Sequence, residues 1–285
     1  MTRIEPVTGK YVYVEVEGRE FRVYFEENGE GIPLLCQHTA GADNRQWRYL
    51  LNDRDVTSFC RVIAPDLPYH GKSLPPEASE WWKEEYRLSR SFFVDFQVSF
   101  SEALGLTKPV YLGCSMGGHL AADLAIERPD AFRAVIGVEA SLSRGKKQYP
   151  DAWFDHPRIG SGFRTYSMLG MMAPSSPEKR KRETIWAYGQ CASSVLRGDL
   201  YYYFVDHDVT DSARQIDTTR ISVFLLTGEY DPGVSPADTR RLAEEIKGAR
   251  FTEMKGLGHF GMCEDFEAFK KYLMPILREI AGQGR

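Results

Sequence analysis

Hydrophobic and polar residues alternate along two neighbouring stretches near the start of the chain. Residues 11–16 and 20–25 flank Glu17-Gly18-Arg19, and their apolar positions recur at a spacing of two. A period of two matches a β-strand with one buried face. The two stretches therefore predict an antiparallel hairpin.

Short apolar runs then alternate with stretches of helical spacing. Such runs are typical of strands buried on both faces. They cover residues 32–37, 60–65, 109–112, 134–139, 221–227 and 250–254, and the helical stretches cover about 46–52, 89–104, 116–125, 236–247 and 264–280. Strands that alternate with helices favour right-handed crossovers and a mainly parallel sheet with helices on both faces. The sequence therefore predicts an α/β fold, to which the hairpin adds an antiparallel edge.

The alternation stops between about residues 142 and 214. This segment contains no obvious strand and is rich in large aromatic and methionine side chains. They include Trp153, Phe154, Phe163, Tyr166, Met168, Met171, Met172, Trp186, Tyr188, Tyr201, Tyr202, Tyr203 and Phe204. We expect an insertion (142–214) in a core made of residues 1–141 and 215–285. Its large side chains would form the roof of an apolar pocket, pack onto the core, or do both.

Composition and charge narrow the class of protein. A net charge of −4 over 285 residues argues against nucleic acid as the main partner. The chain has no run of about 18 apolar residues, so no membrane partner is expected. The start of the chain lacks an apolar signal core, so we expect a cytoplasmic protein. The five cysteines are odd in number and lack a regular spacing, which favours reduced, buried thiols.

The most informative stretch runs from residue 109 to residue 125. An apolar strand breaks at Gly113-Cys114-Ser115-Met116-Gly117 and is followed by a helix of small and apolar residues. The glycines allow a sharp turn that exposes Ser115, and the first N–H groups of the helix point towards the oxygen of a bound carbonyl. This G-x-S-x-G elbow, between a strand and a helix, resembles the nucleophile elbow of the α/β-hydrolase family. The resemblance implies an eight-stranded, mostly parallel sheet flanked by helices, in which residues 142–214 form a helical cap.

A serine nucleophile needs a base, and His259 is the best candidate among the six histidines. His259 lies in the glycine-rich loop 255–261, after the last predicted strand. The carboxyl ends of parallel strands share one edge of a sheet, so this loop lies on the same edge as Ser115. His119 lies in the helix that follows Ser115 and should lean along that helix.

Three carboxylates could orient His259. Asp231 follows the strand of residues 221–226, and the order Ser115, Asp231, His259 matches the order in the family. Glu139, at the end of the strand after the elbow helix, is the main alternative, and Glu229 is a lesser one. Asp66 lies in a segment similar to a family loop, D-x-P-x-H-G-x-S, that is usually structural.

The developing oxyanion needs two N–H donors. One should be the backbone N–H of Met116. The resemblance implies a second donor in the loop after residues 32–37, and the matching residue is Ala40. Thr39 stands where the family usually has glycine, so the choice between Ala40 and Thr39 stays open.

The resemblance implies a cofactor-free serine hydrolase acting on a small-molecule carboxylic ester, through an acyl-enzyme. The apolar insertion favours esters of a small apolar or aromatic acid, with Trp186 and Tyr202 as candidate binding residues. Arg45 could pair with a substrate carboxylate, although a solvent-exposed arginine at a helix start is the favoured interpretation. The aspartates around His207 match no metal-ligand spacing, so no metal is expected.

Other activities of the same fold remain open. The alternatives are a carbon–carbon (diketone) hydrolase or a lactonase on the same triad, a cyanohydrin-cleaving enzyme, a cofactor-independent dioxygenase, and a ligand-binding receptor. The sequence also leaves open whether the chain forms a homodimer.

Overall fold

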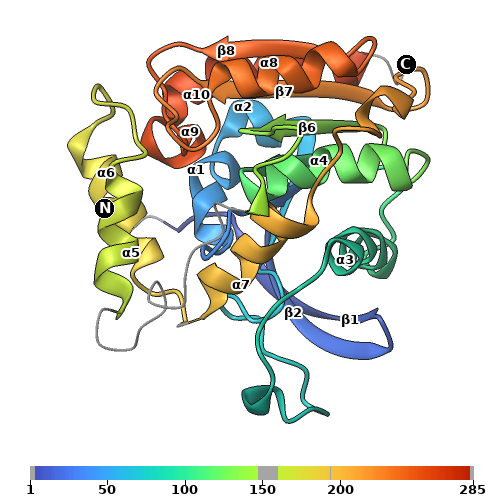
Figure 1. Ribbon diagram of the computed structural model, residues 1–285, viewed down its shortest axis with the longest axis vertical. Helices are drawn as coiled ribbons and strands as arrows, with labels where there is room; N and C mark the ends of the chain where they lie inside the picture. The colour runs from blue at the N-terminus through green and yellow to red at the C-terminus, as the bar shows by residue number, and fades with distance from the viewer. Residues whose placement is uncertain (1–3, 147–159, 193, 283–285) are drawn as a thin grey trace.

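The computed structural model describes residues 4–146, 160–192 and 194–282. An eight-stranded sheet in the order β1-β2-β4-β3-β5-β6-β7-β8 forms its centre (Figure 1). The strands are β1 (Thr8–Val16), β2 (Arg19–Asn28), β3 (Ile32–Gln37), β4 (Cys60–Pro65), β5 (Val110–Cys114), β6 (Ala134–Val138), β7 (Ser222–Gly228) and β8 (Arg250–Met254). Strand β2 pairs antiparallel with β1 and β4, and all other neighbours are parallel. The predicted α/β fold and its antiparallel edge are confirmed.

Helices cover both faces of the sheet. One face carries α3 (Arg90–Ala103), α4 (Met116–Glu127) and α8 (Pro236–Glu245), and the other carries α1 (Arg48–Leu51), α2 (Arg54–Thr57), α9 (Gly261–Glu264) and α10 (Phe266–Gly282). Successive side chains of a strand face opposite sides. Leu35 and Tyr111 accordingly join the first layer of the core, while Leu34 and Leu112 join the second.

Helix α3 shows how the sequence pattern produces the packing. Ser89 caps its first turn by accepting a hydrogen bond from the N–H of Phe92 at 3.1 Å. The phenylalanines of α3 lie on its buried face, and two of them contact β2 edge to face, in the pairs Phe21–Phe92 and Phe25–Phe100. The hairpin is thereby held against the helix.

Two predicted helices are interrupted. The stretch 46–52 is a 3₁₀ helix (Asn44–Trp47) followed by α1. The stretch 264–280 is divided at Asp265, whose backbone is extended (φ −155°, ψ 81°). Its side chain accepts a hydrogen bond from the N–H of Ala268 at 3.1 Å, so Asp265 caps the start of α10 instead of continuing α9.

Helices also occupy the segment between β6 and β7, which we call the inserted segment (139–221). Its described elements are α5 (Gly160–Leu169), α6 (Glu178–Tyr188), α7 (Val195–Tyr201), a π-helix (Tyr202–Asp206) and a 3₁₀ helix (Ala213–Gln215). Figure 1 shows α5 and α6 together at one side of the view. Trp153, Phe154 and His156 lie outside the described residues.

Two further observations concern the whole chain. All five cysteines are free, and four of them are buried, as expected for small core residues. Within the described ranges, no helix has both the length and the apolar composition needed to cross a membrane.

Candidate active site

Ser115 lies between the end of β5 and the start of α4, in a strained turn. Its backbone has φ 57° and ψ −113°, a region that residues other than glycine rarely adopt. The turn is fixed on both sides, because the N–H of Ser115 donates to the carbonyl of Val138 at 2.8 Å and its own carbonyl accepts from the N–H of His119 at 2.9 Å. This is the geometry expected of the elbow.

Close packing around the turn explains its glycines. A Cβ on Gly113 would lie 2.3 Å from the carbonyl oxygen of Gly117, and one on Gly118 would lie 2.0 Å from that of Val138. A Cβ on Gly117 would find its nearest neighbour, Gln37, at 3.3 Å. The tightest contact therefore belongs to Gly118, outside the five-residue motif, and Gly117 is less constrained than the sequence pattern indicates.

His259 and Asp231 form a buried hydrogen-bonded pair. The Nδ1 of His259 lies 2.7 Å from Oδ2 of Asp231, and the other oxygen of Asp231 accepts from the N–H of Gly233 at 2.7 Å. Burial alone would raise the pKa of Asp231, but His259 and the hydrogen bonds around it hold that pKa below its usual value. Asp231 is therefore an anion that accepts the Nδ1–H of His259, which leaves Nε2 as a base.

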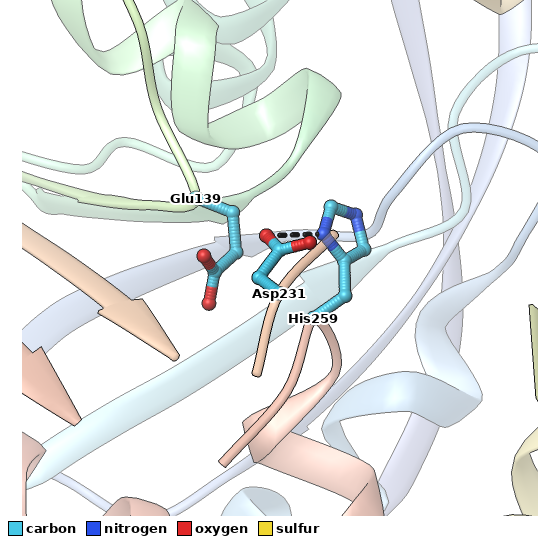
Figure 2. A group of neighbouring side chains, drawn as sticks. All are labelled: Glu139, Asp231 and His259. Atoms are coloured by element: carbon cyan, nitrogen blue, oxygen red, sulfur yellow. Dashed lines mark hydrogen bonds and ion pairs between the residues drawn. The ribbon is translucent and has the colours of Figure 1, made fainter. Parts of the chain in front are cut away.

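Glu139 lies beside this pair (Figure 2). It is fully buried, and its Oε1 accepts from the N–H of Gly228 at 2.9 Å. Burial and the neighbouring Asp231 charge raise the pKa of Glu139 well above its usual value. Glu139 is thus a neutral acid next to the anionic Asp231. Glu229, the third candidate, instead contacts Lys255 and the N–H of Gly256.

Glu139, Asp231 and His259 are also the group in the described residues whose ligand atoms lie close enough together, within 4.8 Å, to hold a metal ion. Their protonation argues against that role. The Oδ2 of Asp231 accepts the Nδ1 proton of His259, and burial raises the pKa of Glu139 well above its usual value, which favours its neutral form. The donor set fits a proton-bearing network better than a cation site.

The loop after β3 places three successive backbone N–H groups, those of Thr39, Ala40 and Gly41, in different environments. The N–H of Thr39 donates to Oε1 of Gln46 at 2.8 Å, and that of Gly41 donates to Oδ2 of Asp199 at 2.7 Å. Between them, the N–H of Ala40 has no hydrogen-bond partner in the described part of the chain. The N–H of Met116, at the first position of α4, has no partner within the helix either.

A cavity of about 360 Å³ brings these groups together. Ser115, His259, Thr39 and Ala40 all line it, whereas Asp231 and Met116 lie behind its wall. Much of the remaining lining is apolar and comes from the inserted segment. That lining consists of Arg144, Ser167, Met168, Met171, Tyr188, Leu196, Leu200, Tyr203 and Phe204, joined by Pro232, Gly233 and Phe260.

The three side chains expected to bind substrate lie elsewhere, which corrects that expectation. Arg45 pairs with Asp43 and reaches Gln190 instead of the cavity. Trp186 is 75 % exposed because it lies on the outer face of α6. Tyr202 is fully buried and donates to Asp123, and its neighbour Tyr203 lines the cavity instead.

Several residues that hold this site together carry no recognisable sequence motif. Gln46 binds the Thr39 N–H and also donates to the Tyr188 hydroxyl at 3.1 Å. Glu264 accepts from the N–H groups of Gly258 at 2.7 Å and Ala173 at 2.8 Å, and the N–H of His259 itself donates to the carbonyl of Met171 at 2.9 Å. The loop of His259 is therefore bonded directly to the inserted segment.

Comparison with known proteins gives a consistent result. A family model described as "Alpha/beta hydrolase family" matches residues 34–269. A 2-hydroxymuconate semialdehyde hydrolase of Pseudomonas putida is 23% identical over 93% of this chain and 94% of its own length. A 2-hydroxy-6-oxo-6-phenylhexa-2,4-dienoate hydrolase of Burkholderia cepacia is 31% identical over 48% of this chain and 49% of its own.

Solved structures share the fold at low sequence identity. A malate-bound thermophilic esterase from Thermogutta terrifontis has a TM-score of 0.79 and 19% identity, and the match covers 95% of this chain and 99% of that one. The enol-lactonase from Burkholderia xenovorans has a TM-score of 0.78 and 18% identity, with 93% and 99% covered.

Proposed function

The chain belongs to the alpha/beta hydrolase family, and we propose that it is a cofactor-free serine hydrolase that cleaves a carboxylic ester through an acyl-enzyme. The observation that carries the proposal is the cavity that Ser115 and His259 both line, with Asp231 bonded to Nδ1 of the His259 imidazole. A strained serine, an oriented histidine and a buried carboxylate are the parts that activate a hydroxyl nucleophile.

In the proposed reaction, Nε2 of His259 accepts the proton of the Ser115 hydroxyl as Oγ bonds to the ester carbonyl carbon. The anionic Asp231 stabilises the imidazolium that forms. The N–H groups of Ala40 and Met116 hold the oxyanion, and Ala40 is preferred to Thr39 because Gln46 occupies the N–H of Thr39.

The second half of the reaction uses the same groups. The tetrahedral intermediate expels the alcohol, which takes the proton from His259. Water then attacks the acyl-enzyme with His259 as base, and the acid leaves as Ser115 regains its proton. The inserted segment acts as the cap over this chemistry, since most of the apolar lining belongs to it.

A second candidate, hydrolysis of a carbon–carbon bond or a lactone with the same residues, draws support from the comparisons. The relative of nearly equal length is named as a hydrolase of 2-hydroxymuconate semialdehyde, and one structural neighbour is named an enol-lactonase. A panel of p-nitrophenyl esters, lactones and β-diketones separates the two candidates by kcat/KM.

Replacement of Ser115 by alanine tests both candidates at once. Members of a catalytic triad act as a unit, so kcat should fall by at least about a thousandfold while the folded state persists. A fluorophosphonate should label the unaltered protein at Ser115 and fail to label the variant. Ser58→Ala, on the exposed surface, is the control. A folded Ser115→Ala protein that keeps most of its activity would refute the covalent mechanism, and an absence of turnover on any substrate would favour a receptor.

A further inference from the structure

Arg144 is the one lysine or arginine among the described residues that line the cavity. It follows β6 and lies at the start of the inserted segment, and its side chain is 15% exposed. Most of the cavity wall is apolar, and it includes Met168, Leu200 and Phe204. A permanent positive charge in an apolar cavity is costly unless an anion or several acceptors satisfy it.

The partners of Arg144 within the described chain do not satisfy it. Its Nη1 lies 3.4 Å from Oδ2 of Asp238, a long contact. The same oxygen also accepts from the hydroxyl of Ser235 at 2.8 Å and from its N–H at 3.2 Å. The Nε of Arg144 is buried and has no hydrogen-bond partner among the described residues. A guanidinium has five N–H donors, so most of those on Arg144 are available to a ligand.

Two other half-buried arginines of the chain lie closer to carboxylates than Arg144 does, although the Nε of Arg90, like that of Arg144, makes no hydrogen bond among the described residues. Arg90 contacts Asp123 at 3.0 Å and Glu127 at 2.9 Å. Arg61 lies 2.6 Å from Glu27. Arg144 has a longer contact with its carboxylate and lies in the cavity wall. If its role were only to hold the chain to α8 through Asp238, it would not need to line the cavity.

We propose that Arg144 binds a carboxylate of the substrate, remote from the bond that is cleaved. This inference rests on the proposed function, since it assigns the substrate class of the same cavity. A monoanion fits better than a phosphate dianion, because a single guanidinium would leave the second charge of a phosphate uncompensated in an apolar cavity of about 360 Å³. The substrate class is therefore a small ester, or its lactone or ketone counterpart, with an apolar body and a carboxylate.

Paired substrates of equal length test the assignment. Mono-p-nitrophenyl glutarate is compared with p-nitrophenyl valerate for a carboxylate on the acyl side. The pair 4-carboxyphenyl butyrate and phenyl butyrate tests the leaving-group side. We expect the unaltered protein to favour the charged member of one pair by about tenfold to a hundredfold in kcat/KM, the range of a charge-assisted hydrogen bond. Equal rates within both pairs would overturn the proposal.

Replacement of Arg144 provides the second arm. Arg144→Gln should abolish the preference and leave kcat/KM for the neutral ester within about threefold. Arg144→Lys should keep part of it, because an ammonium retains the charge without the planar fork. Arg45→Gln, outside the cavity, is the matched control and should keep the full preference.

The double variant Arg144→Gln/Asp238→Asn removes both charges of the pair if the single variant does not fold. Loss of the preference in Arg45→Gln, or its persistence without Arg144, would refute the assignment.

A binding measurement separates this inference from the proposed function. Monomethyl glutarate should bind the Ser115→Ala protein more tightly than dimethyl glutarate does, and Arg144→Gln in that background should remove the difference. Because this readout involves no turnover, it holds even if Ser115 is not the nucleophile. Equal affinity for the two ligands would contradict the role of Arg144 and would leave the proposed function of Ser115 unaffected.

Discussion

At the scale of single residues, the site separates two neighbouring carboxyl groups by their protonation. Asp231 accepts hydrogen bonds from His259 and Gly233, which keep it ionised. Glu139 is fully buried next to that negative charge, so it holds its proton. Two acids placed side by side therefore have different chemistry, which their environments decide.

This difference predicts unequal effects of two conservative variants. Asp231→Asn removes the charge that stabilises the imidazolium, so kcat at pH 7 should fall by about four orders of magnitude. Glu139→Gln replaces a neutral acid by a neutral amide of similar shape, and kcat should fall by less than about tenfold. Steady-state kinetics of both purified variants measure the ranking. The opposite ranking would assign the orienting carboxylate to Glu139.

At this scale, the sequence predicts a residue's role where a motif fixes its backbone. It does not do so where contacts with distant residues determine which groups are free to bind substrate. The strained turn at Ser115 follows from its glycine-flanked motif. The choice of Ala40 over Thr39 depends on Gln46, a residue outside any motif that occupies the N–H of Thr39. Arg144, which follows β6, lines the cavity, whereas Arg45 pairs with Asp43 outside it, and no sequence motif distinguishes the two arginines.

At the scale of elements, the elbow depends on the close approach of α4 to β6. The carbonyl of Val138 accepts the N–H of Ser115, and the same oxygen would meet a Cβ on Gly118 at 2.0 Å. The sequence pattern predicted the strand, the turn and the helix, but the tightest contact, at Gly118, lies outside the five-residue motif. The distance between two elements cannot be read from either element alone, which explains the difference.

The approach of α4 to β6 predicts that the two glycines respond differently to alanine. Gly118→Ala must displace backbone and should lower the free energy of unfolding by roughly 2 kcal/mol or more. Gly117→Ala meets Gln37 at 3.3 Å and gains helix propensity, so its effect should be below roughly 1 kcal/mol. Urea unfolding of both variants measures the difference. Equal destabilisation would mean that the elbow adjusts around either side chain.

At the scale of the whole molecule, a buried ion pair joins the inserted segment to the core. Asp199, on α7, accepts from the N–H of Gly41 and lies 2.9 Å from Nε2 of His70. The Nδ1 of His70 lies 2.9 Å from the carbonyl of Pro68, so both ring nitrogens face acceptors and the ring is an imidazolium. Burial alone would lower the pKa of His70, but Asp199 raises it above its usual value.

The ion pair makes part of the stability depend on pH. Because the folded-state pKa of His70 is raised, its contribution is complete below about pH 6.5 and is lost as pH rises through that folded-state value. Asp199→Asn should lower the free energy of unfolding by roughly 3 kcal/mol at pH 6 and by less at pH 9. His38, which burial keeps neutral with a pKa of about 4, contributes with the opposite pH dependence.

A double-mutant cycle of Asp199→Asn and His70→Gln measures the coupling between these two side chains, including the influence of both on the pKa of His38. The coupling free energy, from urea unfolding, should be larger at pH 6 than at pH 9. A coupling that does not change between these values would show that the pair does not exchange a proton in this range.

The bonds between the inserted segment and the core also bear on how far such a segment can be exchanged between related enzymes. A graft cut at residues 142 and 214 would keep the covalent joints but separate Asp199 from Gly41 and His70, and Ala173 from Glu264. The transplanted helices would then cover the cavity, but the core loops that contain Gly41, His70 and Glu264 would lack the hydrogen bonds that position them. A chimera that is to keep both specificity and rate must therefore inherit residues 38–41, 70 and 256–264 together with the segment, so the unit of recombination is larger than the insertion.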